Sequence, residues 1–317
     1  MADAAGNNQY DNIAKNFLSN KSVIARILKG CAEEFKSFDI ETIIAEGIEK
    51  EPEISKVRVD RPLLIQGENV EDSAIEEGTV FYDIRVDTVV PGTGHKVELI
   101  INLEAQKDKP SAYPLTKRGL YYCSRMISAQ KNTRFTKSDY GEICKVYSIW
   151  IIMNPDVSER NSITEYRVEE RQVVGNFRTE KRNYDLMSMV VISLGDAEYA
   201  ETELLQLLDT VFVSMLPSAE LKEQLSNNFD LELTPKMEKE VSEMCNLSIG
   251  IEERGIEKGI EQGIEKGIDQ GREKGARETN RRLRDLEKMS VSKRAILLDY
   301  TEETIKAWDE NDVPVLA

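Results

Sequence analysis

The sequence predicts an α/β or α+β fold with a mixed β-sheet, and three observations support this prediction. Apolar residues recur at near-3.6 spacing over residues 10–38, which indicates a helix. Two runs rich in β-branched and aromatic residues, 79–90 and 96–106, flank a Pro-Gly turn sequence and predict a β-hairpin. A second helical stretch, 115–130, precedes an apolar strand at 145–153. This order is typical of helices packed on a mixed sheet.

The remaining elements complete one domain, which we expect to span residues 1–245. Residues 51–78 are rich in Pro, Gly and acidic residues and show little periodicity, so they are predicted to be mostly loop. A strand over 184–194 and an apolar-rich helix over 201–216 follow. The domain is predicted to close near Cys245.

The next segment, 246–279, has a four-residue repeat of the form Gly-Ile-Glu-x. Glycine recurs at every fourth position from Gly255 to Gly275, and isoleucine follows in step from Ile256 to Ile268. Each glycine costs about 1 kcal/mol relative to alanine in a helix, so the repeat is a poor solitary helix. Two interpretations stay open: a helix that packs closely against another copy, giving a homodimer, or a partly helical linker.

The tail, residues 280–317, holds two short helical patterns. Thr301 is a predicted N-cap, with Glu302 and Glu303 in the first turn that follows. Simple helix packing and a helix-turn-helix both fit this pattern, and the acidic end of the tail favours packing.

Composition excludes several classes of protein. The chain has 317 residues, a formal net charge of −16, four widely separated cysteines and a single histidine, His95. One histidine excludes Ser-His-Asp triads and His-rich metal sites, and the cysteine spacing disfavours a zinc site. No apolar run approaches the roughly 18–20 residues of a membrane-spanning helix, and the N-terminus has no signal-peptide pattern. We therefore expect a cytoplasmic protein without membrane contact, whose chemistry rests on carboxylates.

One basic segment stands out in this acidic chain. Residues 107–137 contain five Lys, three Arg and one Asp, a net charge of +7, so the rest of the chain carries −23. A solvated helix face would explain such a run. Its position directly after the hairpin makes a phosphate-binding surface an alternative.

The hairpin places carboxylates on one face. If the turn spans residues 92–95, Asp83 lies opposite Glu104, and Gln106 shares their face. Opposed carboxylates repel each other unless a cation compensates them, and hard oxygen ligands suit Mg²⁺ or Mn²⁺. An acidic, solvated hairpin face is the competing interpretation.

The helix over 115–130 carries Arg118, Tyr122 and Arg125 at i, i+4 and i+7, hence on one face. These side chains could contact phosphates and stack on a base. Alternatively Tyr121 and Tyr122 pack in the core and the arginines are solvated.

Several segments together resemble a known family. Phe-Tyr-Asp-Ile-Arg at 81–85 and Asn-Leu-Glu-Ala-Gln at 102–106 resemble the core motif of the PD-(D/E)XK nucleases. Tyr-Asp-Asn-Ile-Ala-Lys at 10–15, Lys-Arg-Gly-Leu-Tyr-Tyr at 117–122, Glu-Met-Cys-Asn-Leu-Ser at 243–248 and the repeat look like the Rpn group. These are recombination-promoting nucleases, also called PD-(D/E)XK nuclease family transposases.

The resemblance implies a restriction-endonuclease-like αβββαβ core and assigns roles to residues. Asp83 and Glu104 would be metal ligands, with a further ligand from the carbonyl of Ala105. Gln106 stands where the broader superfamily has Lys and would position the attacking water. Asp11 matches an acidic position of the group; an N-cap or a solvated carboxylate fits it equally, and Glu77 is a weaker candidate.

The sequence therefore predicts a Mg²⁺-dependent DNA endonuclease associated with recombination or mobile elements. The phosphates of bound DNA would contact the basic side chains Lys107, Lys117, Arg118 and Arg125, with Tyr122 beside them. Two alternatives stay open: a catalytically degenerate scaffold that self-associates through the repeat, and a nuclease restrained by its acidic C-terminus.

Overall fold

The computed structural model describes residues 2–58, 81–104 and 114–311. The chain divides into two compact units, Met1–Ile249 and Gly250–Ala317. The first unit holds the sheet and the candidate site, and each unit is described by itself below.

The described strands form one mixed sheet in the order β1-β2-β3-β4-β6-β5. The three strands β1 to β3 pair antiparallel, β3, β4 and β6 run parallel, and β5 is antiparallel to β6. This arrangement confirms the predicted α/β class with a mixed sheet. The strand bounds are Glu53–Arg58, Phe81–Val89, Lys96–Glu104, Lys145–Ile152, Ser162–Arg167 and Met187–Ser193.

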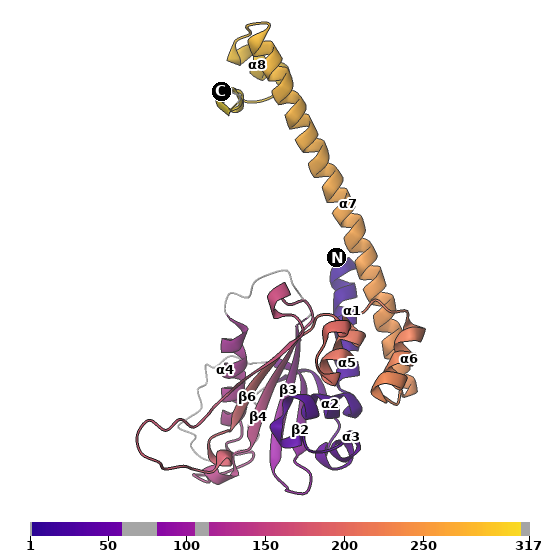
Figure 1. Cartoon of the computed structure of the whole chain (residues 1–317), viewed down its shortest axis with the longest axis vertical. Helices are drawn as coiled ribbons and strands as arrows, with labels where there is room; N and C mark the ends of the chain where they lie inside the picture. Colours follow the sequence, from indigo (N-terminus) through magenta and orange to yellow (C-terminus); the bar gives the residue numbers. More distant parts are fainter. Residues whose placement is uncertain (1, 59–80, 105–113, 312–317) are drawn as a thin grey trace. The chain divides into compact units, whose positions relative to one another are not determined.

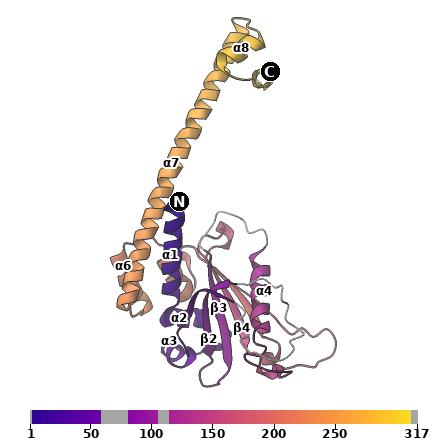
Figure 2. The same cartoon turned by 180° about the vertical axis from the view of Figure 1, so that it is seen from behind.

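Helices cover both faces of this sheet (Figures 1 and 2). One face is covered by α4, and the other by α1, α2 and α5. The described α-helices that lie wholly in this unit are α1 (Ala2–Leu18), α2 (Lys21–Cys31), α3 (Ile40–Thr42), α4 (Leu115–Ser128), α5 (Glu203–Phe212) and α6 (Ser218–Phe229). Coverage on both sides explains why β4 is buried along almost its whole length.

The two faces of the sheet bury different side chains because successive residues of a strand alternate. On the α4 side, Ile100, Trp150 and Met189 pack against Tyr122 and other residues of α4. On the opposite side the neighbouring strand residues Leu99, Ile101, Ile149 and Ile151 are buried as well. The face of β3 that was predicted to be apolar is therefore buried as expected, and the opposite face of β3 is covered as well.

The helix predicted over residues 10–38 is interrupted. It consists of α1 and α2, and the Asn20 side chain caps α2 by accepting a hydrogen bond of 2.9 Å from the Ser22 N–H. A capping side chain satisfies a backbone donor that the helix itself leaves open, so a new helix can start there. Gly30 allows α2 to approach α5, since a Cβ there would lie 2.5 Å from Leu204 Cδ2.

Two strands lie where the sequence predicts none. β1 falls in the segment predicted as loop, and β5 follows β4 without a clear sequence signal. Both are the outer strands of the described sheet, so each takes its hydrogen bonds from a single neighbour. Edge strands carry weak burial patterns because one side and often one face meet solvent, and β5 is largely exposed.

The second unit is helical. It contains the later part of α7 (Pro235–Asp285), α8 (Val291–Leu298) and α9 (Glu302–Asn311), and the described repeat residues are helical throughout. Ala295, Ile305 and Trp308 form its small core. Thr301 Oγ1 accepts a 3.2 Å hydrogen bond from the Thr304 N–H, which confirms the predicted N-cap.

A partly buried ion pair joins the helices at the end of this unit. The Arg294 guanidinium donates to Asp309 Oδ2 at 2.7 Å and to Asn280 Oδ1 at 2.6 Å. Arg277 also lies over the Trp308 ring, 5.4 Å from its centroid. α8 and α9 thus pack on the end of α7. This is the simple helix packing that the acidic sequence of the tail predicted. Among the described helices, none is long and apolar enough to cross a bilayer.

Candidate functional site

The register of the β2–β3 hairpin decides how its carboxylates lie. The strands pair from Ile84 with Ile101 to Val89 with Lys96, and the Val90 N–H donates to the His95 carbonyl at 2.8 Å. The turn therefore spans residues 91–94, not 92–95. Gly92 and Gly94 adopt positive φ angles of 71° and 72°, which favour glycine and close the turn earlier than predicted.

This correction shifts the pairing by two residues. Arg85 lies opposite Ile100 rather than Asn102, and Asp83 comes beside Asn102 rather than Glu104. A shift of two preserves the strand face, because side chains alternate with period two. Asp83, Asn102 and Glu104 therefore still share one face, at the end where β2 begins and β3 ends.

Asp83 is held by two contacts. Its Oδ2 accepts a hydrogen bond of 2.8 Å from the Leu103 N–H, which joins its side chain to β3. Its Oδ1 forms an ion pair of 2.9 Å with the ammonium of Lys15 from α1. The carboxylate is thus oriented from two elements and is about a quarter exposed, at 24%.

Lys15 is the residue of this site that the sequence reasoning missed. Its ammonium also binds Asp11, one helical turn earlier, so it bridges two carboxylates while only 14% of its side chain is exposed. Burial opposes the charge, but the hydrogen bonds that the ammonium donates to Asp11 and Asp83 raise the pKa of Lys15. The i, i+4 spacing of Asp11 and Lys15 in the Tyr-Asp-Asn-Ile-Ala-Lys segment was the available signal.

Glu104, at the end of β3, lacks such compensation. Its carboxylate accepts no hydrogen bond from any described residue, while its backbone carbonyl accepts one of 3.1 Å from the Met153 N–H. Burial raises the pKa of Glu104; the charge of Arg118 opposes this shift, and the charges of Asp83 and Asp11 add to it. The Glu104 carboxylate is therefore harder to ionise than an exposed glutamate.

Arg118 is held in place from α4 and supplies the second cation. Its guanidinium carbon lies 4.8 Å from the centre of the Trp150 ring, and its Nε donates to the Tyr122 hydroxyl at 3.1 Å. The Trp150 indole is itself anchored to Ser148 Oγ at 2.9 Å. An arginine stacked and hydrogen-bonded in this way is preorganised to bind an anion.

The expected DNA-contacting face of α4 is smaller than predicted. Tyr122 and Arg125 are each only 7% exposed, so Tyr122 packs in the core and cannot stack on a base. Arg125 donates to the Tyr121 hydroxyl at 3.1 Å, and Tyr121 is the exposed tyrosine, at 46%. One side of α4 covers the sheet, which is why each turn of the helix buries some of its residues. Lys117 and Arg118 stay accessible.

Four of the predicted site residues lie outside the described residues: Glu77, Ala105, Gln106 and Lys107. The structure brings together Asp11, Asp83, Glu104 and Arg118 from four separate elements, as the charge interactions at Glu104 show. Lys15 joins them through its two ion pairs.

The donors at this position suit a hard divalent cation. Mg²⁺ usually takes one or two carboxylates together with water, and Asp83 and Glu104 offer that set. Asn102, on the same face, keeps a buried Nδ2 without a partner, and Glu104 has free acceptor oxygens. Within the described residues, three or more acidic, His or Cys side chains do not gather around one point. The site therefore offers a divalent cation two carboxylates, and Lys15 competes with that cation for Asp83.

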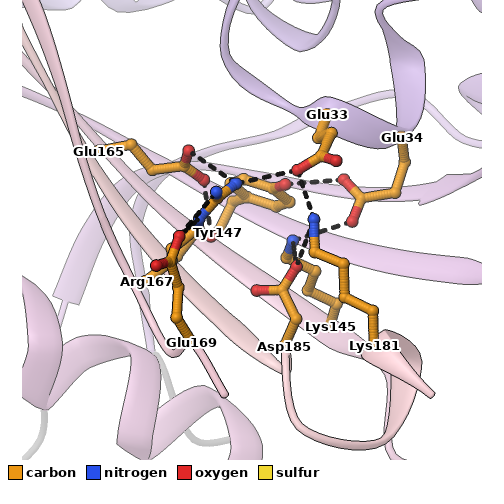
Figure 3. A network of polar contacts seen from close by, with 10 residues as sticks. Glu33, Glu34, Lys145, Tyr147, Glu165, Arg167, Glu169, Lys181 and Asp185 are labelled. Carbon is orange, nitrogen blue, oxygen red and sulfur yellow. Dashed lines mark hydrogen bonds and ion pairs between the residues drawn. The ribbon is translucent and has the colours of Figure 1, made fainter. Parts of the chain in front are cut away.

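A second polar cluster lies at the opposite ends of the parallel strands (Figure 3). Lys145, at the start of β4, binds Glu34 at 2.9 Å and Asp185 at 2.7 Å, and the Tyr147 hydroxyl donates to Glu34 at 2.7 Å. Burial opposes the ionisation of Glu34, but the bonds from Lys145 and Tyr147 lower the pKa of Glu34. Its charge is thus satisfied by neighbours, in contrast to Glu104, and the cluster holds the short helix Glu33–Phe35 on the sheet.

Comparison of the chain with protein-family models, curated proteins and solved structures gave no match. The site is therefore interpreted from its own geometry.

Proposed function

We propose that this protein is a metal-dependent nuclease that hydrolyses phosphodiester bonds in DNA, with a role in recombination or mobile elements. The observation that carries the proposal is the pair Asp83 and Glu104, on one face at the end where β2 begins and β3 ends, with Lys15 bridging Asp83 to Asp11 and the charge of Arg118 acting on Glu104. A partly buried carboxylate with a raised pKa, beside cations, is a candidate for a functional site, and Glu104 is such a carboxylate. The order of helices and strands up to β4 also agrees with the αβββαβ core that the resemblance to the Rpn group implies.

Asp83 and Glu104 would hold the metal in this proposal, with the Ala105 carbonyl as the third ligand that the resemblance implies. A divalent cation bound there would lower the pKa of a water molecule and neutralise charge on a phosphoryl oxygen. Glu104 must be ionised to act as a ligand, so its raised pKa makes metal binding depend on pH.

The residues of the chain itself orient the substrate and the carboxylates. Arg118, held against Trp150 and Tyr122, would contact a phosphate close to Glu104. Lys15 holds Asp83 and Asp11 in place and contributes positive charge from α1. In the broader superfamily, a Lys at the position of Gln106 supplies positive charge of this kind. For Gln106 itself we propose the role of orienting the attacking water.

Cleavage of supercoiled plasmid with Mg²⁺ or Mn²⁺ tests the proposal. Asp83→Asn and Glu104→Gln should each reduce metal-dependent nicking by about 100-fold or more, because each removes a charged ligand without changing side-chain size. Glu142→Gln, an exposed carboxylate in the short 3₁₀ helix Tyr140–Glu142 before β4, is the matched control and should keep full activity.

Circular dichroism and urea unfolding would establish that the variants are folded. Nicking that persists in both site variants, or that a chelator does not stop, would refute the proposal. A folded protein that cleaves nothing with either metal would support the scaffold alternative.

A further inference from the structure

The repeat in α7 arranges its side chains in rows. Residues four apart lie nearly above one another on a helix, so a four-residue repeat produces four rows about 100° apart. One row is glycine (Gly263, Gly267, Gly271), and the next is isoleucine (Ile260, Ile264, Ile268). An acidic row (Glu265, Asp269, Glu273) follows the isoleucine row, and a Lys/Gln row (Gln262, Lys266, Gln270, Lys274) adjoins the glycine row on its other side.

The isoleucine row and the glycine row have no partner within the described part of the chain. Ile260, Ile264 and Ile268 are 58%, 59% and 52% exposed, which is unusual for large apolar side chains that recur at regular spacing. A Cβ placed at Gly263, Gly267 or Gly271 would meet no atom within 4 Å. The helix therefore presents an apolar ridge directly beside an open groove.

Ridge and groove are complementary to each other. Rows of residues four apart run at about −26° to the helix axis, and two helices that interlock such rows cross at about −50°. The isoleucine ridge of one helix then enters the glycine groove of a second helix with the same sequence, and the reverse contact forms at the same time. A surface that fits a copy of itself in this way suits a two-fold dimer.

Charge decides the relative direction of the two helices. With a two-fold axis along the helices, each isoleucine row meets the partner's glycine row, and each Lys/Gln row meets the partner's acidic row. An antiparallel two-fold pair instead brings acidic row against acidic row and Lys/Gln row against Lys/Gln row. Like charges in direct opposition destabilise a contact, so the parallel arrangement is favoured.

We propose that α7 pairs two copies of this chain in parallel, with the isoleucine row of each copy in the glycine groove of the other. The pair is a crossed contact of a few turns, because a period of four exceeds 3.6 and turns the rows in the opposite sense to a heptad coiled coil. Pairing also explains how a glycine-rich helix is stable, since packing replaces the helix propensity that glycine lacks. The proposal is independent of the nuclease assignment.

The mass of the full chain in solution, measured by light scattering, tests the contact. The unaltered chain should be a dimer, and Gly267→Ala combined with Gly271→Ala should weaken the dimer about tenfold or more by filling the groove. Alanine raises helix propensity, so circular dichroism should show undiminished helix in that variant. Glu238→Ala, at an exposed position of α7 before the repeat, should leave the dimer unchanged. A monomeric parent, or a dimer insensitive to the alanine pair, would overturn the proposal.

Charge reversal tests the direction. Lys266→Glu with Lys274→Glu, and separately Glu265→Lys with Asp269→Lys, should each weaken the parallel dimer by opposing like charges. An equimolar mixture of the two variants should recover a dimer, because the reversed rows then face opposite charges. In an antiparallel pair these rows already face like charges, so neither variant alone would weaken the dimer, and that result would overturn the parallel direction.

Discussion

Individual residues at the candidate site differ in how completely their charge is compensated. Asp83 has the Lys15 ammonium and the Leu103 N–H, whereas Glu104 has no hydrogen-bond donor among the described residues. At the other end of the strands, Glu34 is fully engaged by Lys145 and Tyr147. The pKa of Glu34 is accordingly lowered and that of Glu104 is raised, although both carboxylates are partly buried. The charge of Glu34 is thus satisfied by its neighbours, whereas the carboxylate of Glu104 lacks such partners among the described residues.

The pKa of Glu104 should respond to its neighbours in opposite directions. Asp83→Asn removes a negative charge and should lower the pKa of Glu104, while Arg118→Gln removes a positive charge and should raise it. Carboxyl ¹³C NMR titration of the metal-free full chain would measure both shifts. Because a metal ligand must be ionised, the affinity for Mg²⁺ should weaken as the pH falls through the pKa of Glu104.

A distant exposed carboxylate controls for general electrostatic effects. Glu142→Gln should leave the Glu104 titration unchanged, since the main charges acting on Glu104 are those of Arg118, Asp83, Asp11 and Lys15. If Asp83→Asn and Arg118→Gln shift the pKa in the same direction, the three side chains do not form one charge cluster.

Close packing between elements positions the helices that carry the site. α4 reaches the sheet at Gly119, where a Cβ would lie 2.5 Å from the sulfur of the fully buried Met189 on β6. This approach brings Arg118, the preceding residue, toward Trp150. A glycine in the middle of a helix is thus explained by the sheet beneath it, and not by the helix itself.

Gly119→Ala should lower the free energy of unfolding. The added methyl group would lie 2.5 Å from Met189 and must displace it. Overpacking costs about 1–3 kcal/mol, and so close a contact should cost more than the gain of about 1 kcal/mol in helix propensity. Urea unfolding measures the change. Ser124→Ala, at an exposed position of the same helix, is the control and should stay within about 0.5 kcal/mol of the parent.

A second substitution separates overpacking from other effects. Met189→Ala makes room, so Gly119→Ala should cost less in that background than in the parent chain. Equal costs in both backgrounds would show that the space between α4 and β6 is not the cause.

At the scale of the whole molecule, the sheet unit carries its own core. The first turns of α7 belong to it, because Met237, Val241 and Met244 are 1%, 0% and 1% exposed. The described repeat lies beyond this buried stretch and presents exposed isoleucines. The chain therefore combines a packed α/β unit with a helical unit that has its own small core.

A chain ending at residue 249 should fold, unfold cooperatively in urea with an unchanged midpoint, and be monomeric. It retains the buried start of α7 and loses the repeat. Urea unfolding and light scattering measure these properties, and plasmid nicking should match that of the full chain. A sharp rise in nicking would instead favour restraint by the C-terminal region, and a truncated chain that is unfolded would contradict the independence of the sheet unit.

The sequence by itself determined the class of fold and the elements with strong local signals. The hairpin strands, α4, β4 and the Thr301 cap follow from alternation, periodicity and a capping side chain, all of which act within a few residues. The face shared by Asp83 and Glu104 was also predictable, because it depends only on the parity of the register.

The tertiary structure alone decided which distant residues meet. Lys15 reaches Asp83 across 68 positions of sequence, and Tyr122 is buried because α4 covers the sheet. The outer strands β1 and β5 form because a neighbouring strand offers hydrogen bonds, and neither has a strong pattern of its own. Such contacts depend on the packing of whole elements, whereas a periodic pattern reports only which side of one element is buried.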